Sequence, residues 1–404
     1  MDDQPARLSD LARVFLKIGA MSYGGPAIMG IMQSEIQERR RWLGKERFVE
    51  GLSIVNMLPG PGATQLAIFI GHTKGGLAGG IVAGVCFIIP AFAIMLLLAS
   101  AYGAFGALPA MRNAFYGIGP VVVGIFAVAI YRLARGTIKD RLQIPIAVAA
   151  VGLLLFSPFG LAVTLLAAGC TGVALFHSWR AGLAALLVLV LAVAGAYAAE
   201  GFIVGSVPPV AGPGPRSAVG PATLWDVGVY FFKVGTFTFG GGLSMLAFMQ
   251  EQVVNQFGWL TPQEFVDGLA LGQLTPGPVL MLAAFIGYKL FGVLGAAVAA
   301  GAIFLPSFLM VLSILPLLRR MKDLLWLKAF MRGVAPAVIG ALGVSVVQMA
   351  PHAAPDIFTW GLLGGSIAIA LFSKLGPLPL MAGGAVLGFL SLRKTWDFVR
   401  TLAG

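Results

Sequence analysis

Long apolar runs separated by short polar stretches occupy most of this chain. Most of these runs are long enough to cross a hydrocarbon layer of about 30 Å as a helix. The pattern therefore predicts an all-α polytopic membrane protein. About 13 apolar segments are expected, at 11–33, 50–71, 76–101, 111–134, 142–157, 159–176, 182–204, 225–249, 266–288, 291–317, 327–349, 357–372 and 376–392.

The segments fall into two similar halves. The stretch FLKIGAMSYGG at 15–25 returns as FFKVGTFTFGG at 231–241, and the Pro-Gly-Pro run at 59–61 returns at 276–278. We interpret this as an internal duplication covering roughly 11–178 and 227–392. The predicted domains are a first transmembrane repeat at 1–180, an extra segment with a Pro/Gly linker at 181–226, and a second, inverted repeat at 227–404.

The extra segment at 182–204 makes the number of crossings before the second half odd, so the second half enters the membrane from the opposite side. Arg132, Arg135 and Lys139 place the loop after the fourth segment inside, whereas its counterpart at 351–356 has no Lys or Arg. This charge difference agrees with the positive-inside rule. An inverted-topology repeat of the kind found in secondary transporters is therefore expected.

A basic stretch indicates that some of the segments do not cross the membrane. If all thirteen crossed with the N-terminus inside, the five basic residues between 39 and 47 would lie outside. If segments one and two of each half are re-entrant hairpins that turn at their glycine or proline breaks, this stretch stays inside. We therefore expect two hairpins per half and nine full crossings. Both alternatives leave the C-terminus outside, which Arg393, Lys394 and Arg400 oppose.

Composition narrows the functional classes. The 404 residues are 58% hydrophobic and 11% charged, whereas soluble proteins carry roughly 25% charged residues. The net charge of +11 reflects cytoplasmic loops. Two cysteines in apolar runs and three scattered histidines predict neither a disulfide framework nor a metal centre. No HExxH, P-loop or GxSxG motif is found, so we expect no enzyme, no cofactor and no nucleic-acid partner.

The glycine and proline breaks are where chemistry is expected. Non-helical backbone at membrane depth occurs where it lines a polar cavity, and the N-terminus of a half-helix attracts anions. Four such breaks near the midplane would form a compact anion site. The candidate substrate-binding residues are Lys17, Ser22, Tyr23, Gly24, Gly25, Asn56, Pro59, Gly60, Gly62, Thr64, Gln65, Lys233, Thr238, Gly240, Gly241, Gly242, Ser244, Gln273, Thr275 and Gly277.

Charged residues that recur in both halves leave alternatives open. Lys17 and Lys233 are either anion ligands or anchors whose ammonium groups reach the membrane surface. Glu50 and Asp267 are candidates for proton coupling, although acids in the first turn of a helix commonly serve as dipole partners. Glu35, which matches Glu251, faces either the neighbouring arginines or solvent.

The paired motifs resemble the chromate ion transporter family. FxKxG…GG, a following Trp-Leu pair and N/Q-x-x-P-G-P occur in both halves and are similar to that family's signature. The resemblance covers nearly the whole chain and implies its long, two-domain form. It implies a multi-pass carrier in the bacterial inner membrane that exports chromate, with proton exchange as the proposed driving force. Where the first half has Pro26 and Met57-Leu58, the second has Gly242 and Leu274-Thr275, so the halves are not interchangeable.

The expected partners are chromate, with sulfate as a competitor of similar charge and shape, the lipid bilayer and coupling protons. Transport would draw on the proton gradient or the membrane potential. A passive oxyanion channel or a sulfate transporter is the alternative, and a cation-coupled carrier for another solute is less well supported because the midplane has few acids. The sequence leaves open the direction of transport and the oligomeric state, a homodimer included.

Overall fold

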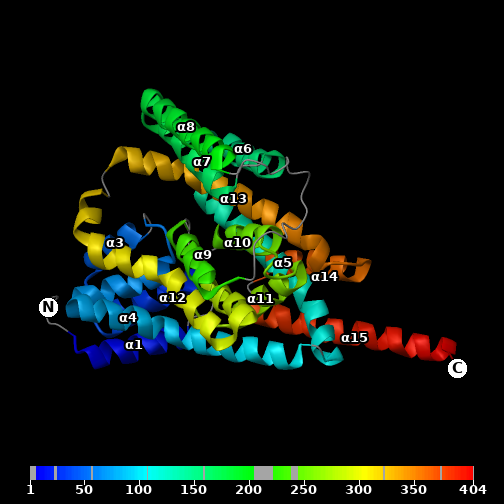
Figure 1. The fold of residues 1–404 in the computed structure, drawn as a ribbon. Coiled ribbons are helices and arrows are strands. Elements are labelled where there is room, and N and C mark those ends of the chain that lie inside the picture. Colours follow the sequence, from blue (N-terminus) through cyan, green and yellow to red (C-terminus); the bar gives the residue numbers. More distant parts are fainter. Residues whose placement is uncertain are drawn as a thin grey trace.

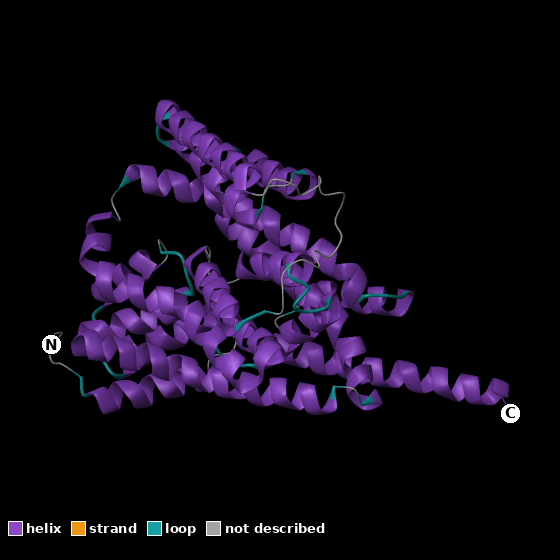
Figure 2. Cartoon of the chain, viewed as in Figure 1, coloured by secondary structure: helices purple, strands orange, loops and turns teal. Residues whose placement is uncertain are grey.

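The computed structural model describes residues 6–21, 25–55, 58–106, 108–157, 160–203, 222–237, 244–321, 324–373 and 375–403. These residues form helices joined by short turns, with no strand among them (Figures 1 and 2). The fold class predicted from the hydropathy pattern, an all-α polytopic protein, is confirmed.

Among the described residues, the first half and the extra segment form eight α-helices and one short π-helical turn. Their bounds are α1 Leu8–Met21, α2 Gly25–Gln33, η1 Ser34–Arg39, α3 Lys45–Val55, α4 Gly62–Phe105, α5 Pro109–Thr137, α6 Gln143–Phe156, α7 Leu161–Phe176 and α8 Trp179–Ile203.

The second half repeats this order. Its bounds are α9 Leu224–Phe237, α10 Ser244–Met249, η2 Gln250–Gln256, α11 Pro262–Leu274, η3 Val279–Met281, α12 Leu282–Met321, α13 Leu325–Ala353, α14 Ile357–Phe372 and α15 Pro377–Ala403. Here η2 is a π-helical turn that occupies the place of η1, and η3 is a single 3₁₀ turn.

The first apolar segment of each half folds back on itself. In the first half, Lys17 on α1 lies 3.9 Å from the carboxylate of Glu35 on η1, across the break that follows α1. In the second half, the Tyr230 hydroxyl on α9 donates to the Phe248 carbonyl on α10 at 3.4 Å. Residues on either side of each break are therefore neighbours, as a helical hairpin requires.

The second apolar segment of each half also folds back, around Pro-Gly-Pro. Gly51 on α3 packs against the ring of Phe69 on α4, and Gly268 on α11 packs against the ring of Phe285 on α12. A side chain at either glycine would overlap the ring. Helical hairpins are thus present in both halves, and their re-entry into a bilayer remains a prediction.

The boundary expected between segments two and three is a kink within one long helix. α4 has non-helical backbone at Gly75–Gly76, and α12 has it at Phe291–Gly292. Beyond the first kink the chain turns back, so that Gly79 lies against the backbone of Gly71. The hairpin arm and the following helix are therefore adjacent and antiparallel, packed through small residues.

The equivalent helices α4 and α12 cross each other in antiparallel orientation. Gly80 on α4 lies beside Leu312 on α12, and Gly84 lies beside Phe308. Moving forward along one helix therefore means moving backward along the other. In this register the equivalent residues Ile88 and Phe304 lie at the centre of the crossing. Figure 1 shows α12 in yellow above α4 in blue and cyan.

The remaining helices form bundles around α5 and α13. α15 meets α5 through glycine contacts, Gly384 and Gly388 against Gly117, and α7 meets α13 where Gly172 lies against Gly333. Such small-residue contacts let helices approach closely in lipid. In Figure 1, α8 lies at one edge of the molecule and α15 projects beyond the opposite side.

Length and composition identify membrane-spanning candidates among the described residues. Four helices are long and apolar enough: Gly62–Phe105, Pro109–Thr137, Val279–Ser313 and Leu325–Ala353. Shorter apolar helices occur at Gln143–Phe156, Leu161–Phe176, Trp179–Gly195, Ile357–Phe372 and Pro377–Ser391. These helices are consistent with a multi-pass membrane protein.

Candidate functional site

α1 and α9, the helices that lead into the first break of each half, end beside the crossing of α4 and α12. Gly19, near the end of α1, packs against the backbone carbonyl of Phe87, and Gly235, near the end of α9, packs against that of Ile303. Both carbonyls lie within one residue of the centre of the crossing. The ends of α1 and α9 therefore lie at the same level of the molecule.

The two Pro-Gly-Pro breaks reach the crossing from its two sides. A Cβ atom at Gly60 would lie 2.8 Å from the hydroxyl of Ser307 on α12, and one at Gly277 would lie 3.0 Å from Cβ of Ala91 on α4. Ser307 and Ala91 occupy equivalent positions, each directly after a proline. Each break is thus held against the long helix of the other half.

Gly60 is the tightest point of the first break. Its φ of +123° is a conformation that side-chain-bearing residues rarely adopt. A Cβ atom there would lie 2.5 Å from Nε2 of Gln65 as well as close to Ser307. The same Nε2 donates to the carbonyl of Pro59 at 2.5 Å, which fixes the amide across the turn.

Three buried polar atoms at this break have no hydrogen-bond partner among the described residues. They are Oγ1 of Thr64, Oε1 of Gln65 and Oγ of Ser307, and each side chain is fully buried. Leaving a buried polar group unpaired costs about 1–3 kcal/mol. Native proteins tolerate few such groups, and a functional role is one of the usual reasons.

The helix end beside these atoms carries unpaired N–H groups. α4 begins at Gly62 after Pro61, and no side chain caps it. Its first-turn amides are donors with a partial positive charge. The helical turn after the second Pro-Gly-Pro, η3, follows Pro278 and also has no side-chain cap. The start of α4 is therefore suited to an anion.

The second Pro-Gly-Pro break is apolar. Gly277 also has positive φ, at +102°. Around it, the positions that correspond to Thr64 and Gln65 hold Leu280 and Met281, both buried. The hydroxyl of Thr275 is already paired, because it donates to the Leu271 carbonyl at 2.7 Å. The two breaks share backbone shape but not chemistry.

The other candidates are placed less fully. Gly25 begins α2, Ser244 begins α10, and Gln273 lies half-buried in the last turn of α11. A Cβ at Gly62 would lie 3.3 Å from the end of Met29, so α2 approaches the first break. Eight candidates lie outside the described residues: Ser22, Tyr23, Gly24, Asn56, Thr238, Gly240, Gly241 and Gly242.

Lys17 takes part in a cluster of charges on the α1–η1 hairpin. Its side chain is 51% exposed and lies 3.9 Å from Glu35, which also accepts from Arg39 at 3.4 Å and Arg40 at 3.0 Å. Burial would raise the pKa of Glu35, but the Arg40 hydrogen bond and the charges of Lys17, Arg40 and Arg39 outweigh it, so this pKa lies below its usual value. Glu35 therefore faces the neighbouring basic residues.

Among the described residues of the second half, the positions that match Lys17 and Glu35 do not form a cluster of charges. Lys233 is exposed on α9. Glu251, the counterpart of Glu35, accepts instead from the amides of Asn255 at 3.0 Å and Gln256 at 3.4 Å. The recurrence of the lysine in the sequence is thus not matched by a recurrence of its ion pair in the described residues.

Asp267 lies in a buried polar network. It is 5% exposed and accepts from the hydroxyl of Tyr102 at 2.7 Å and from Nε2 of Gln263 at 3.0 Å. The ammonium group of Lys289 lies 5.8 Å from the centre of the Tyr102 ring and pairs with Glu264 at 2.8 Å. Tyr102 lies in the last turn of α4, in the first half, so this network joins the two halves.

Glu50, the counterpart of Asp267, has different surroundings. It receives a hydrogen bond from Arg47 at 2.5 Å, and its side chain is 23% exposed. Glu50 thus has an arginine partner and partial contact with solvent, whereas Asp267 is buried. The two acids that match in the sequence are therefore unequal in the structure.

Ser307 and Tyr102 are missing from the candidates derived from the sequence. A signal for Ser307 existed: Pro306 matches Pro90, yet the next residue is a serine in one half and Ala91 in the other. A hydroxyl after a proline in an apolar run is a weak signal until the fold brings it to Gly60. Tyr102 gave no signal, because its counterpart in the repeat is Leu318 and its partner Asp267 is distant in the chain.

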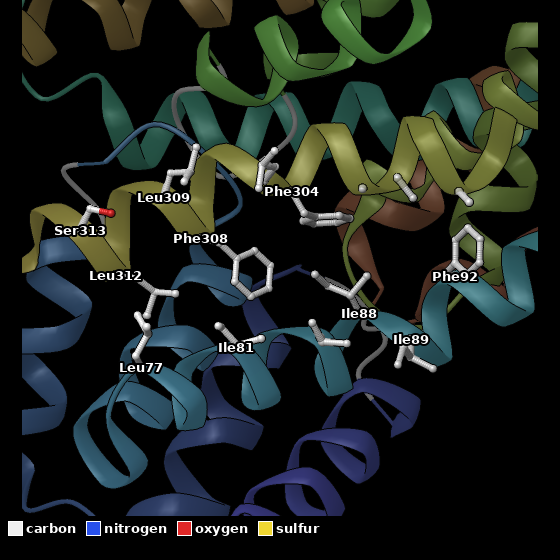
Figure 3. Close-up of a pocket in the computed structure, with 15 residues that line it drawn as sticks. Leu77, Ile81, Ile88, Ile89, Phe92, Phe304, Phe308, Leu309, Leu312 and Ser313 are labelled. Atoms are coloured by element: carbon white, nitrogen blue, oxygen red, sulfur yellow. The ribbon is translucent and has the colours of Figure 1, made fainter. Parts of the chain in front are cut away.

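The groove between α4 and α12 is a different kind of space. It has a volume of about 620 Å³ and is lined almost wholly by apolar side chains, among them Ile81, Ile88, Phe92, Phe304 and Phe308. Figure 3 shows these side chains from both helices facing one another. A groove of this character suits hydrocarbon rather than an anion. The described residues contain no cluster of His, Cys, Asp and Glu able to hold a metal ion.

Comparison with known proteins gives a consistent assignment. The family model for chromate transporters matches residues 9–196 and 225–389. The chain is 35% identical to the chromate transport protein of Cupriavidus metallidurans, covering 95% of this chain and 93% of that protein. It is 33% identical to a probable chromate transport protein of Synechococcus elongatus, covering 93% of each chain.

A more distant relative also matches most of the chain. An uncharacterised transporter of Methanocaldococcus jannaschii is 26% identical over 94% of this chain and 93% of its own length. No solved structure matches the chain.

Proposed function

Because the chain belongs to the chromate transporter family, we propose that it is a secondary carrier that exports chromate across the bacterial inner membrane. The anion binds where the helix breaks meet the crossing of α4 and α12. Sulfate, which has the same charge and tetrahedral shape, competes for the same site.

The observation that carries this proposal is the pair of unpartnered hydroxyls, those of Thr64 and Ser307, at the first break. Both residues are fully buried; Thr64 lies in the first turn of α4, which no side chain caps, and Ser307 lies against Gly60, just before that turn. A tetrahedral oxyanion would accept hydrogen bonds from the hydroxyls and the helix amides. Hydrogen bonds of this charge-assisted kind are roughly twice as strong as neutral ones.

The antiparallel crossing of equivalent helices supports an inverted repeat. If α4 and α12 both span the membrane, their opposite directions mean that the two halves enter from opposite faces. The hairpins then re-enter from the two sides and meet at the midplane. Rocking of one half against the other about this crossing would expose the site to each side in turn.

Asp267 is the better of the two candidates for proton coupling. It is buried and hydrogen-bonded to Tyr102 of the other half, whereas Glu50 pairs with Arg47 and is partly exposed. A buried carboxylate that bridges moving parts can gain or lose a proton as they separate. Proton movement through Asp267 would thereby link transport to the gradient.

Flux measurements in liposomes test this function. Chromate loaded inside vesicles containing the full chain should leave faster when a pH gradient is imposed, and the rate should saturate with chromate concentration. Sulfate in excess should slow it. Steady, non-saturating current would instead indicate a passive channel, and absence of flux with and without the gradient would refute the proposal.

A further inference from the structure

We infer that the duplicated fold holds a single oxyanion site, built by the first Pro-Gly-Pro break and completed by Ser307 from the other half. The inference rests on the proposed function and assigns its site. The sequence analysis expects all four breaks, from both halves, to contribute to this site.

The first step is the loss of polar groups at the second break. Each polar side chain of the first site is replaced in the second: Thr64 by Leu280, Gln65 by Met281 and Ser307 by Ala91. All three replacements are buried and apolar. A dehydrated oxyanion beside them would lose its water without gaining side-chain hydrogen bonds, which is strongly unfavourable.

The second step is the geometry of the first break. The Gln65 amide and the Ser307 hydroxyl both lie within 3 Å of the point that a Cβ on Gly60 would occupy, at 2.5 and 2.8 Å. They are therefore neighbours that both pack against Gly60, where any side chain would overlap them. Thr64, next to Gln65 in the first turn of α4, adds a second unpaired hydroxyl.

The third step is that the three polar side chains come from both halves of the chain. Thr64 and Gln65 belong to the hairpin of the first half, whereas Ser307 belongs to α12 of the second half. An anion that binds all three bridges the two halves at the crossing. Movement of one half relative to the other would separate Ser307 from the hairpin, so occupancy and conformation would be coupled.

The role of Ser307 is that of a ligand to the anion, not a packing residue alone. Ser307 directly follows Pro306 inside α12. Because proline has no N–H, a proline inside a helix leaves a carbonyl of the preceding turn without its usual hydrogen bond. The Oγ of Ser307 nevertheless has no hydrogen-bond partner among the described residues. A hydroxyl that neither pairs with the backbone nor reaches solvent is available to a bound oxyanion.

Calorimetric binding to the purified full chain in detergent tests this inference, with sulfate as a redox-inert probe and chromate as the second ligand. The wild-type protein should bind one anion per chain. Gln65→Met and Ser307→Ala, which install the residues of the second half, should each weaken binding at least ten-fold. Met281→Leu at the matching position of the second break is the control and should leave the dissociation constant unchanged.

Folding of each variant is checked by its melting temperature, and Gln65→Glu provides a variant of nearly equal shape whose negative charge should also abolish binding. Two anions per chain, or wild-type affinity in Gln65→Met and Ser307→Ala, would overturn the inference while leaving the proposed function intact. A wild-type protein that neither binds nor transports either anion would refute both.

Discussion

Gly60 shows how one residue sets the shape of the first break. Its positive φ turns the chain between α3 and α4, and its missing side chain leaves room for the Gln65 amide and the Ser307 hydroxyl. Gly277 repeats the backbone turn but not the polar surroundings. At this scale the halves are alike in conformation and different in chemistry.

Gly60→Ala should therefore impair both stability and binding. The residue would be strained at positive φ, at a cost of about 1–3 kcal/mol, and its methyl group would overlap the two polar groups. We expect a lower melting temperature and at least ten-fold weaker sulfate binding by calorimetry. Gly30→Ala is the matched control, since a Cβ there meets nothing within 4 Å. Normal binding in Gly60→Ala would show that the turn at Gly60 does not shape the anion site.

Substitutions of Asp267 and Glu50 distinguish a role in proton coupling from a role in chromate binding. Asp267→Asn keeps the size of the side chain but cannot lose a proton, so chromate flux should no longer respond to a pH gradient, while chromate exchange without a gradient persists. Glu50→Gln should retain the response, because Glu50 is paired with Arg47 and partly exposed. The comparison uses flux in liposomes at several imposed gradients. An undiminished response in Asp267→Asn would remove Asp267 from the coupling mechanism.

At the scale of elements, the hairpins are the units that bring the breaks to the crossing. The Lys17–Glu35 ion pair links the two arms of the α1–η1 hairpin, and Gly51 packs against the ring of Phe69 in the α3–α4 hairpin. Both hairpins pack against the part of α4 that follows its kink. The α3–α4 hairpin also contacts α12, through Gly60 and Ser307. The long helices provide the frame, and the hairpins provide the site.

The ion pairs of Glu35 make the first hairpin sensitive to acid. The pKa of Glu35 is lower in the folded chain than its ordinary value, despite the opposing effect of burial, because Arg40, Lys17 and Arg39 favour the ionised form. Its stabilising contribution is thus present at neutral pH and is lost as the pH falls through the folded pKa. The melting temperature should drop in acid for the wild type and change less for Glu35→Gln. Equal acid sensitivity in the two proteins would contradict this role.

Much of this arrangement could be predicted from the sequence, and the failures have physical causes. Apolar length predicts the helices, and Pro-Gly-Pro predicts breaks, because these residues disrupt helices wherever they occur. Symmetry alone could not predict that Thr64 and Gln65 meet Ser307, since that contact depends on the antiparallel register of α4 and α12. Nor could it predict the partner of Asp267, because Tyr102 comes from the other half.

At the scale of the whole molecule, the proposed rocking of one half against the other requires that the two halves have inverted orientations in the membrane. The antiparallel crossing of α4 and α12 is the geometric argument, and the difference in loop charge after the fourth segment of each half is the independent one. The basic residues near the end of α15 oppose the predicted outside C-terminus, and their side chains are not among those described. Orientation in the membrane is therefore best measured directly.

Cysteine labelling of intact cells tests the orientation. Pro355→Cys, in the exposed loop before α14, should react with an impermeant maleimide from outside, whereas Lys139→Cys, in the loop after α5, should react only after permeabilisation. Both are introduced into a background lacking the half-buried Cys86 and Cys170. Labelling of both positions from the same side would contradict an inverted repeat.

The most direct test of the central claim is to locate chromium in the full chain with chromate bound, by anomalous diffraction. The account predicts one chromium position per chain, within hydrogen-bonding reach of Thr64 and Ser307 at the first break. Chromium beside Gly277, or beside Lys233 with the first break empty, would contradict it.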